Sequence, residues 1–329
     1  MAAFTVAIRA CNGEKYLPLI LDKLKEQVNI ENIDWEIVIV DNNSTDNTAK
    51  IIKKYQSDWP KPYPLKYYFE AEQSAFLARK RAIKEARGDL IGFLDDDNIP
   101  ASNWVEEAYS FGQSHPQVAA YGSQIHGEYE VEPPPNFERI AGFIPIIERP
   151  KAICFNHYLY GKKGLLPPGA GLVIRKKVWL ENVPEKLHFQ GPVGKSLGAK
   201  GEDIEALIHI KKAGKEIWYN PKMAIFHQIP KTRFDREYLR RFFRGIGSGR
   251  YRLRMARYKS WQRPFMTLLY IVNDLRKVIF HFFKYRTVLA TDVVAAGEME
   301  LYLSTLASPF LGWQKRITAI GKAKIKGKA

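Results

Sequence analysis

Apolar and polar positions alternate in blocks along the first hundred residues, and the blocks predict strands and helices in turn. Short apolar runs at 4–8, 35–40 and 90–94 are typical of buried strands. Helical patterns lie between them, near 48–55 and 74–87 and on a first helix whose apolar face is formed by Leu17, Ile20, Leu21 and Leu24. Strands alternating with helices indicate a parallel sheet with crossover connections, that is, an α/β fold.

Carboxylates follow two of these strands directly. Asp41 follows the second strand, and Asp95, Asp96 and Asp97 follow the third. Because the C-terminal ends of parallel strands meet at the edge where ligands bind, these side chains should share one crevice with residues 9–12. Three adjacent negative charges repel one another unless a cation lies among them, and oxygen ligands suit Mg²⁺ or Mn²⁺ holding a phosphate. Taken alone, the triad also fits a solvated acidic turn.

Two predicted helices bring further charged groups. The helix at 74–87 presents small residues for close packing on the sheet and leaves Arg79 near the crevice. Farther along, apolar residues at i, i+3 and i+4 from Ile204 predict a helix that begins at Glu202 or Asp203. A carboxylate at a helix N-terminus is stabilised in its ionised form, so Asp203 is able to accept a proton. A plain helix cap is the alternative for this residue.

In their joint order and spacing, these landmarks resemble the family 2 glycosyltransferases of the GT-A fold. The resemblance covers about residues 4–250 and implies a Rossmann-like, mostly parallel central sheet with flanking helices. The matching segments are Asn12, residues 40–46, Ala78-Arg79, residues 88–97, Gly169-Ala170-Gly171, Gly201-Glu202-Asp203 and His227.

The resemblance also implies a role for each matching residue. Asp97 would be the direct ligand of Mn²⁺ or Mg²⁺ bridging the donor diphosphate, and His227 a further metal or diphosphate contact. Asp203 would be the general base on the acceptor hydroxyl in an inverting displacement. The residues expected to contact the nucleotide sugar, typically a UDP-sugar, are Ala10, Asn12, Asp41, Arg79, Asp95, Asp96 and Gly171. Of these, Asp41 would accept a hydrogen bond from the base. His227 follows a strand-like segment and also fits a buried core histidine.

The chain departs from the family pattern at two places that matter. Its first loop reads Arg9-Ala10-Cys11-Asn12 where Pro-Thr-Tyr-Asn is common, which changes the stacking expected on the base. The Gln-x-x-Arg-Trp motif of processive synthases is absent, since residues 240–244 lack the tryptophan. We therefore expect transfer of one sugar, a hexose or N-acetylhexosamine, to a hydroxyl of a glycan or lipid-linked acceptor in bacterial cell-surface polysaccharide biosynthesis.

Charge is distributed unequally along the chain. Residues 1–230 hold 29 basic and 29 acidic residues, whereas residues 231–329 hold 22 basic and 6 acidic ones and so carry the whole formal charge of +16. Aromatic residues are interleaved with the basic ones between 231 and 263. Such a patch suits an anionic surface, either nucleic acid or a lipid leaflet.

The segment 264–290 favours lipid over nucleic acid. It is apolar and aromatic, but charged residues interrupt it, so no uncharged run reaches the ~18 residues of a spanning helix. Amphipathic helices lying in the membrane interface fit this pattern. A packed helical hairpin or an oligomer interface is the alternative. The predicted partner is an anionic membrane surface, with no nucleic acid, and the predicted location is cytoplasmic, peripheral on the inner face of the plasma membrane.

Length and composition suggest two parts. We expect a GT-A catalytic domain over 1–250 and a basic, amphipathic and membrane-associating helical tail over 251–329. Within the catalytic domain, the nucleotide-sugar half would cover about 1–125 and the acceptor half about 126–250. The two cysteines supply no disulfide framework, and no signal peptide is expected before Phe4.

Two other functions remain as alternatives. A sugar-phosphate nucleotidyltransferase shares a related sheet but usually carries a glycine-rich signature with Arg or Lys after the first strand, which Gly13 alone does not supply. A non-catalytic basic binding protein explains the tail but not Asp41, the aspartate triad and Asp203 together.

Overall fold

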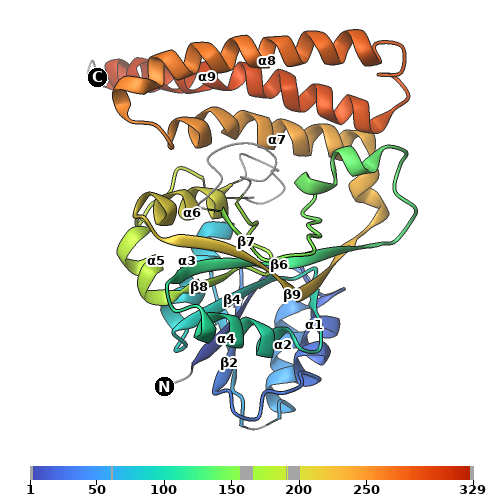
Figure 1. The fold of residues 1–329 in the computed structure, drawn as a ribbon, viewed down its shortest axis with the longest axis vertical. Coiled ribbons are helices and arrows are strands. Elements are labelled where there is room, and N and C mark those ends of the chain that lie inside the picture. Colours follow the sequence, from blue (N-terminus) through green and yellow to red (C-terminus); the bar gives the residue numbers. More distant parts are fainter. Residues whose placement is uncertain (1–2, 61, 156–165, 190, 192–200, 327–329) are drawn as a thin grey trace. The chain divides into compact units, whose positions relative to one another are not determined.

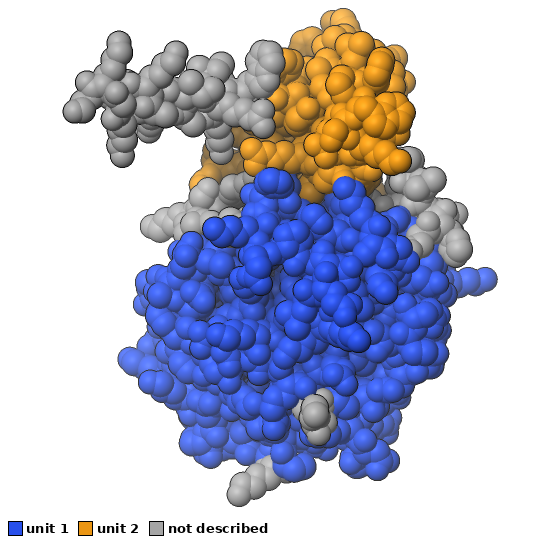
Figure 2. Space-filling view, turned by 90° about the vertical axis from the view of Figure 1, so that its left-hand side faces the viewer, with its two compact units in different colours: residues 1–132, 140–194, 202–230 blue, residues 133–139, 195–201, 231–329 orange. Residues whose placement is uncertain are grey.

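The structure is a computed structural model. It describes residues 3–60, 62–155, 166–189, 191 and 201–326, with the backbone alone for 312–326. The chain divides into two compact units, coloured separately in Figure 2. Unit 1 comprises residues 1–132, 140–194 and 202–230, and unit 2 comprises residues 133–139, 195–201 and 231–329. Arg250, where the predicted catalytic domain ends, lies inside a helix of unit 2.

The first half of unit 1 is the predicted parallel sheet with its crossover helices (Figure 1). Neighbouring strands run in the order β3-β2-β1-β4, and all three pairings are parallel. The strands are β1 (Phe4–Ala10), β2 (Trp35–Asp41), β3 (Leu65–Phe69) and β4 (Leu90–Asp95). The crossover helices are α1 (Leu17–Lys25), α2 (Thr48–Ser57) and α3 (Ala75–Glu85). The three expected strands and the helices between them are therefore confirmed, whereas β3 was not expected from the sequence.

Successive side chains of β1 point to opposite faces of the sheet, and different helices cover the two faces. Phe4, Val6 and Ile8 join the main hydrophobic core with the apolar faces of α1 and α2 and with helix α4 (Trp104–Ser114). Helix α3 packs against β1 and β2 from the opposite side. The small-residue face predicted for this helix is buried, with Ala75, Ala78, Ala82 and Ala86 each at most 3% exposed. Small side chains let the helix approach the sheet closely.

The second half of unit 1 makes the sheet mixed, so the expectation of a mostly parallel sheet is wrong there. Strand β8 (Val173–Arg175) runs antiparallel to β4 and to β6 (Val118–Tyr129). Strand β9 (Glu216–Ile229) is parallel to β6 but antiparallel to β5 (Asn98–Pro100) and β7 (Ile153–Cys154). A parallel neighbour needs a long, usually helical, crossover. The helices among the described residues between β6 and β8 are single turns, one of them at Ala141–Phe143, and the short strand β7 is also there. Two helices complete this half, α5 (Lys176–Asn182) and α6 (Glu202–Lys212).

Unit 2 is a packed set of three long helices (Figure 1). They are α7 (Arg236–Met255), α8 (Arg263–Tyr285) and α9 (Val293–Lys326), with short turns at Phe137–Arg139, Lys231–Phe234 and Ser260–Gln262. The interrupted apolar segment forms one continuous helix, α8, rather than several. Its charged interruptions do not break it, because Arg and Lys are good helix formers. Among the described helices, none is long and apolar enough to cross a membrane.

Candidate active site

The first two loops at the C-terminal edge of the sheet are locked together by hydrogen bonds. Asn12, in a left-handed backbone conformation with φ 57°, accepts the N–H of Thr45 through its side-chain oxygen at 2.8 Å. The carbonyl of Ala10 accepts the N–H of Asn42. Asp41 is buried below them, and its carboxylate accepts the N–H of Ser44 at 2.9 Å and the hydroxyl of Tyr67 at 3.1 Å. These contacts fix the Asp41 carboxylate at the C-terminal edge of the sheet.

The three aspartates after β4 point to three different partners. Asp95 forms an ion pair with Arg9, with 2.8 Å between Oδ1 and Nη2. Asp96 accepts the backbone N–H of Cys11 at 2.6 Å. Asp97 lies against His227, with 3.4 Å between its Oδ2 and the histidine Nε2. Burial, and then the neighbouring Asp97, raise the pKa of Asp96 to about 7, although Arg9 and the N–H of Cys11 lower it.

Asp97 and His227 are the pair that fits a divalent cation. Two ligands of one octahedral Mg²⁺ or Mn²⁺ lie about 3 Å apart, close to the 3.4 Å found here. Pairing across the sheet holds the two residues together, since β5 and β9 place Asn98 opposite His227. Over the described residues, no group of three or more histidine, cysteine or acidic side chains is arranged to hold a metal. The remaining ligands would come from water and donor oxygens, as is usual for Mg²⁺.

A chain of alternating charges links the aspartate row to α3 and α6. Glu202, the first residue of α6, lies between two arginines, with its Oε1 3.9 Å from Arg9 Nη1 and 3.8 Å from Arg79 Nη1. Both Glu202 and Arg79 are buried, and the Arg79 guanidinium also lies over the ring of Phe93. Burial alone lowers the pKa of Arg9, but Asp95, Glu202 and the other aspartates outweigh it and raise that pKa above its usual value. Arg9 and Arg79 are therefore fixed cations of the site.

Asp203 lies at the far end of this charge network. Its Oδ2 accepts the N–H of Gly169 at 2.7 Å, and its Oδ1 accepts the N–H of Ile204 at 2.8 Å. Burial and the neighbouring Glu202 raise the pKa of its carboxyl, whereas Arg79 lowers it. Both hydrogen bonds fix the orientation of the carboxylate, and its raised pKa makes it a stronger base than an exposed aspartate.

The two glycines of the 169–171 loop have different surroundings. A Cβ on Gly169 would overlap the Arg79 guanidinium and lie 3.3 Å from Asp203 Oδ2. Gly171, with φ 64°, instead faces the sheet, where its carbonyl accepts the hydroxyl of Ser123 and its N–H donates to Phe93. Within this loop, Gly169 is the residue in contact with the charged side chains of the site.

The structure gives roles to two residues for which the sequence predicted none, Arg9, which was expected only to lie at this edge of the sheet, and Glu202. A basic residue at the end of the apolar β1 strand is the signal for Arg9, because parallel pairing with β4 places it opposite Asp95. The sequence indicates Glu202 as a possible helix start and as part of the Gly201-Glu202-Asp203 match, without a role for its side chain. No sequence signal indicates that its side chain bridges two arginines that lie far from it along the chain.

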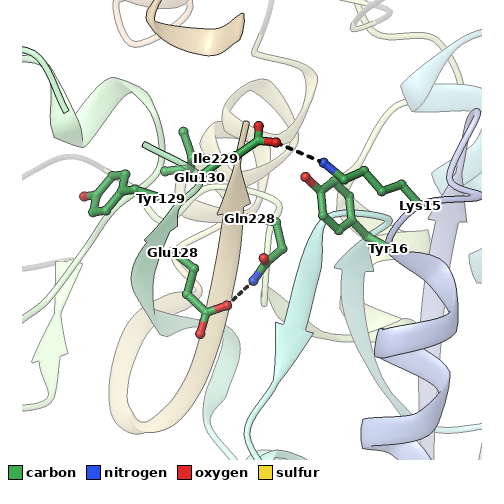
Figure 3. Close-up of a pocket in the computed structure, with 7 residues that line it drawn as sticks. All are labelled: Lys15, Tyr16, Glu128, Tyr129, Glu130, Gln228 and Ile229. Atoms are coloured by element: carbon green, nitrogen blue, oxygen red, sulfur yellow. Dashed lines mark hydrogen bonds and ion pairs between the residues drawn. The ribbon is translucent and has the colours of Figure 1, made fainter. Parts of the chain in front are cut away.

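A separate surface pocket of about 320 Å³ lies beside the end of β9 (Figure 3). Its wall includes ion-paired Lys15 and Glu130, and Gln228, whose backbone N–H donates to the carbonyl of Asp97. The other lining residues are Tyr16, Glu128, Tyr129 and Ile229. None of the candidate catalytic or metal residues lines it, so this pocket is distinct from the candidate site.

Comparison with known proteins identifies the class to which this fold and site belong. The profile of Glycosyl transferase family 2 matches residues 5–179, more than half of the chain. The chain therefore belongs to glycosyl transferase family 2 and is a glycosyltransferase.

A curated relative is the poly(ribitol-phosphate) beta-N-acetylglucosaminyltransferase TarS of Staphylococcus aureus. It is 30% identical over 117 residues, which is 35% of this chain and 20% of TarS. A second is the putative teichuronic acid biosynthesis glycosyltransferase TuaG of Bacillus subtilis, 32% identical over 77 residues, or 23% of this chain and 30% of TuaG. The match thus spans a fifth to less than a third of these relatives.

Solved structures establish the fold. The mannosyltransferase PcManGT of Pyrobaculum calidifontis, in complex with GDP-Man and Mn²⁺, is similar with a TM-score of 0.57 and 16% identity, covering 93% of this chain and 87% of that one. Residues 1–349 of TarS in complex with UDP-GlcNAc give a TM-score of 0.52 and 16% identity, covering 93% and 91%. At this identity the likeness concerns the fold alone, which is GT-A.

Proposed function

We propose that this glycosyltransferase moves one sugar from a UDP-sugar to a hydroxyl of a glycan or lipid-linked acceptor, with inversion, in cell-surface polysaccharide biosynthesis. One observation carries the proposal. Ion pairs join Asp95 of the aspartate row at 95–97 to Arg9, Glu202 and Arg79, and the candidate base, Asp203, follows Glu202 in the chain and lies with Arg79 beside Gly169. An inverting displacement needs stabilisation of the leaving group and removal of a proton from the acceptor. The aspartate row and Asp203 would serve these two tasks.

The donor is proposed to lie along the crevice with its base above Asp41. The Asp41 carboxylate is held by Ser44 and Tyr67, so its orientation does not change when a base N–H approaches. Ala10 and Asn12 would border the nucleotide, and the acceptor would contact the half of the catalytic domain after about residue 126. The TarS complex with UDP-GlcNAc supports a UDP-sugar, with an N-acetylhexosamine as one candidate.

Asp97 and His227 would hold Mn²⁺ or Mg²⁺, which when bound supplies Lewis-acid stabilisation of the diphosphate leaving group. Arg9 acts independently of the cation. By pairing with Asp95 it removes one negative charge from the row that the donor diphosphate must approach.

Asp203 is proposed to take the proton from the acceptor hydroxyl as that oxygen attacks the anomeric carbon. The N–H of Gly169 and that of Ile204 hold its carboxylate in place. Glu202 acts as a positioning residue, since it keeps Arg79 beside Asp203 without contacting the substrate in this scheme. Arg79 then stabilises the ionised base.

The membrane surface is part of the same proposal. The concentration of positive charge in residues 231–329 supports attachment to an anionic leaflet, on the cytoplasmic face where a lipid-linked acceptor is within reach.

The decisive experiment is a donor screen with the full chain in Mn²⁺ or Mg²⁺. UDP-sugars and GDP-sugars are offered with candidate lipid-linked and glycan acceptors, and nucleoside diphosphate release and product anomeric configuration are measured. We expect UDP release that needs both the acceptor and the metal. Pyrophosphate formed from UTP and a sugar phosphate would instead indicate a nucleotidyltransferase. Retention of the donor's anomeric configuration would contradict a single displacement.

A further inference from the structure

The outer face of α8 is a broad apolar surface. Large side chains from Phe265 to Phe283 are 46–71% exposed, a stretch of about 27 Å along the helix. We call this surface the α8 apolar face. It is formed by Phe265, Leu268, Leu269, Val272, Leu275, Ile279, Phe280, Phe282 and Phe283. A contiguous apolar patch of this size marks an interaction site rather than ordinary scatter of surface residues.

Polar contacts on the opposite side of α8 fix this orientation. Asp274 is buried and receives Arg254 of α7, with 3.0 Å between Nη2 and Oδ1. Seven residues later, His281 is also buried and its Nε2 contacts the carbonyl of Ala295 in α9 at 2.9 Å. Residues seven apart share one helical face. The side of α8 that faces its neighbours is therefore specified by buried polar pairs, which leaves the apolar side outward.

Basic residues border the α8 apolar face, and acidic residues do not. Between residues 256 and 291 the chain has seven basic residues and one acid, and that acid is the buried Asp274. Arg276 lies exposed within the face, and Arg263 and Arg286 are exposed near its two ends. Two further acids of unit 2 are paired inside it, Glu298 with Arg139 and Glu300 with Arg244.

We infer that the α8 apolar face inserts into the interface of an anionic lipid bilayer, with α8 parallel to the membrane plane. A bilayer offers apolar chains below a layer of negative headgroups, which matches an apolar stripe bordered by cations. A second copy of this chain would bring one basic border against another. Nucleic acid would leave the apolar side chains in water. The inference rests on the membrane attachment in the proposed function and deepens it, because it names the surface that enters the bilayer; it does not depend on the proposed chemistry of sugar transfer.

The test uses the full chain and vesicles of phosphatidylcholine with or without phosphatidylserine, in a sedimentation assay. Leu268→Asp places a charge in the α8 apolar face. Leu180→Asp is the matched control, because Leu180 of α5 is 63% exposed and Leu268 is 64% exposed. We expect binding to anionic vesicles that falls at least ~10-fold in Leu268→Asp and is unchanged in Leu180→Asp. Arg276→Glu should weaken binding to the anionic vesicles and leave binding to the neutral ones unchanged.

Three results would overturn the inference. One is failure of the full chain to bind anionic vesicles. Another is equal binding by Leu268→Asp when its melting temperature matches that of the unsubstituted chain. A third is a concentration-dependent dimer, or duplex DNA binding, that Leu268→Asp abolishes while vesicle binding persists. UDP–Mn²⁺ binding measured on the same samples separates the two proposals, since a chain that binds vesicles but no nucleotide contradicts only the proposed function.

Discussion

The prediction with the most direct bearing on catalysis is that Asp203→Asn abolishes transfer and keeps donor binding. Asparagine has nearly the same size as aspartate but cannot take a proton. Removing a general base costs about 100-fold or more in turnover, equivalent to roughly 2.7 kcal/mol of activation free energy. Donor affinity should change little, because the base serves the acceptor rather than the nucleotide.

The structure sets the expected effect of this substitution on stability. The Asp203 carboxylate accepts two backbone N–H groups, from Gly169 and Ile204, and an asparagine oxygen can replace only one of these acceptors. Losing one such bond costs about 1–3 kcal/mol. The raised pKa of Asp203 acts in the opposite direction, since the ionised carboxylate is disfavoured in the folded protein, and asparagine carries no charge. We therefore expect a folded variant whose free energy of unfolding falls by no more than about 2 kcal/mol.

Turnover with acceptor, donor affinity by calorimetry and thermal unfolding are measured for Asp203→Asn and for Glu205→Gln. Glu205 is the matched control, because it lies on the same helix, is buried, and also accepts two backbone N–H groups, those of His188 and Phe189. Glu205→Gln should keep its turnover. Turnover of Asp203→Asn within tenfold of the unsubstituted protein, or an equal loss in both variants, would refute the assignment of Asp203 as base.

Three further predictions concern other parts of the molecule. Glu202→Gln removes a negative neighbour and so lowers the pKa of Asp203. Turnover falls at acidic pH as the base becomes protonated, so this fall should move to lower pH in the variant. A fall at the same pH as in the unsubstituted protein would contradict this. Asp97→Ala should abolish Mn²⁺-dependent UDP binding in a folded protein, and unchanged calorimetric affinity would remove Asp97 as a ligand. Gly247→Ala should lower the melting temperature, because its Cβ would overlap Ser304 and lie 2.9 Å from the Leu301 carbonyl. Such overpacking costs about 1–3 kcal/mol. Gly142→Ala is the control and should leave the melting temperature unchanged, because its Cβ would meet nothing within 4 Å.

The parallel half of the fold was predictable because its buried central strands are long apolar runs that stand out in the sequence. Each apolar run forms a strand, and the residues that follow β2 and β4 lie at the expected edge. The mixed half was not predictable in the same way. Strands β5, β7 and β8 have only two or three residues, too few to show a period, and their pairing depends on partners far along the chain.

The sequence predicted those site residues that follow directly after a recognisable strand or begin a recognisable helix. The position of Asp97 at the edge of the sheet follows from the apolar run before it, but its contact with His227 depends on the pairing of β5 with β9. The bridge from Glu202 to Arg9 and Arg79 was not predictable either, because three segments have to meet before the ion pairs exist. The α8 helix shows the same limit: its apolar residues were evident, but only the buried Asp274 and His281 determine which side faces outward.

The hydrogen bond from Gly169 to Asp203 has a consequence for how this enzyme can evolve. The donor is a backbone N–H, which needs no side chain, but any side chain at position 169 would meet the Arg79 guanidinium. The basicity of Asp203 therefore depends on the path of the 169–171 segment and on a glycine at its first position. A lengthened or shortened loop that draws this N–H away would leave a more basic carboxylate, and the pH optimum of transfer could drift between relatives whose catalytic aspartate never changes.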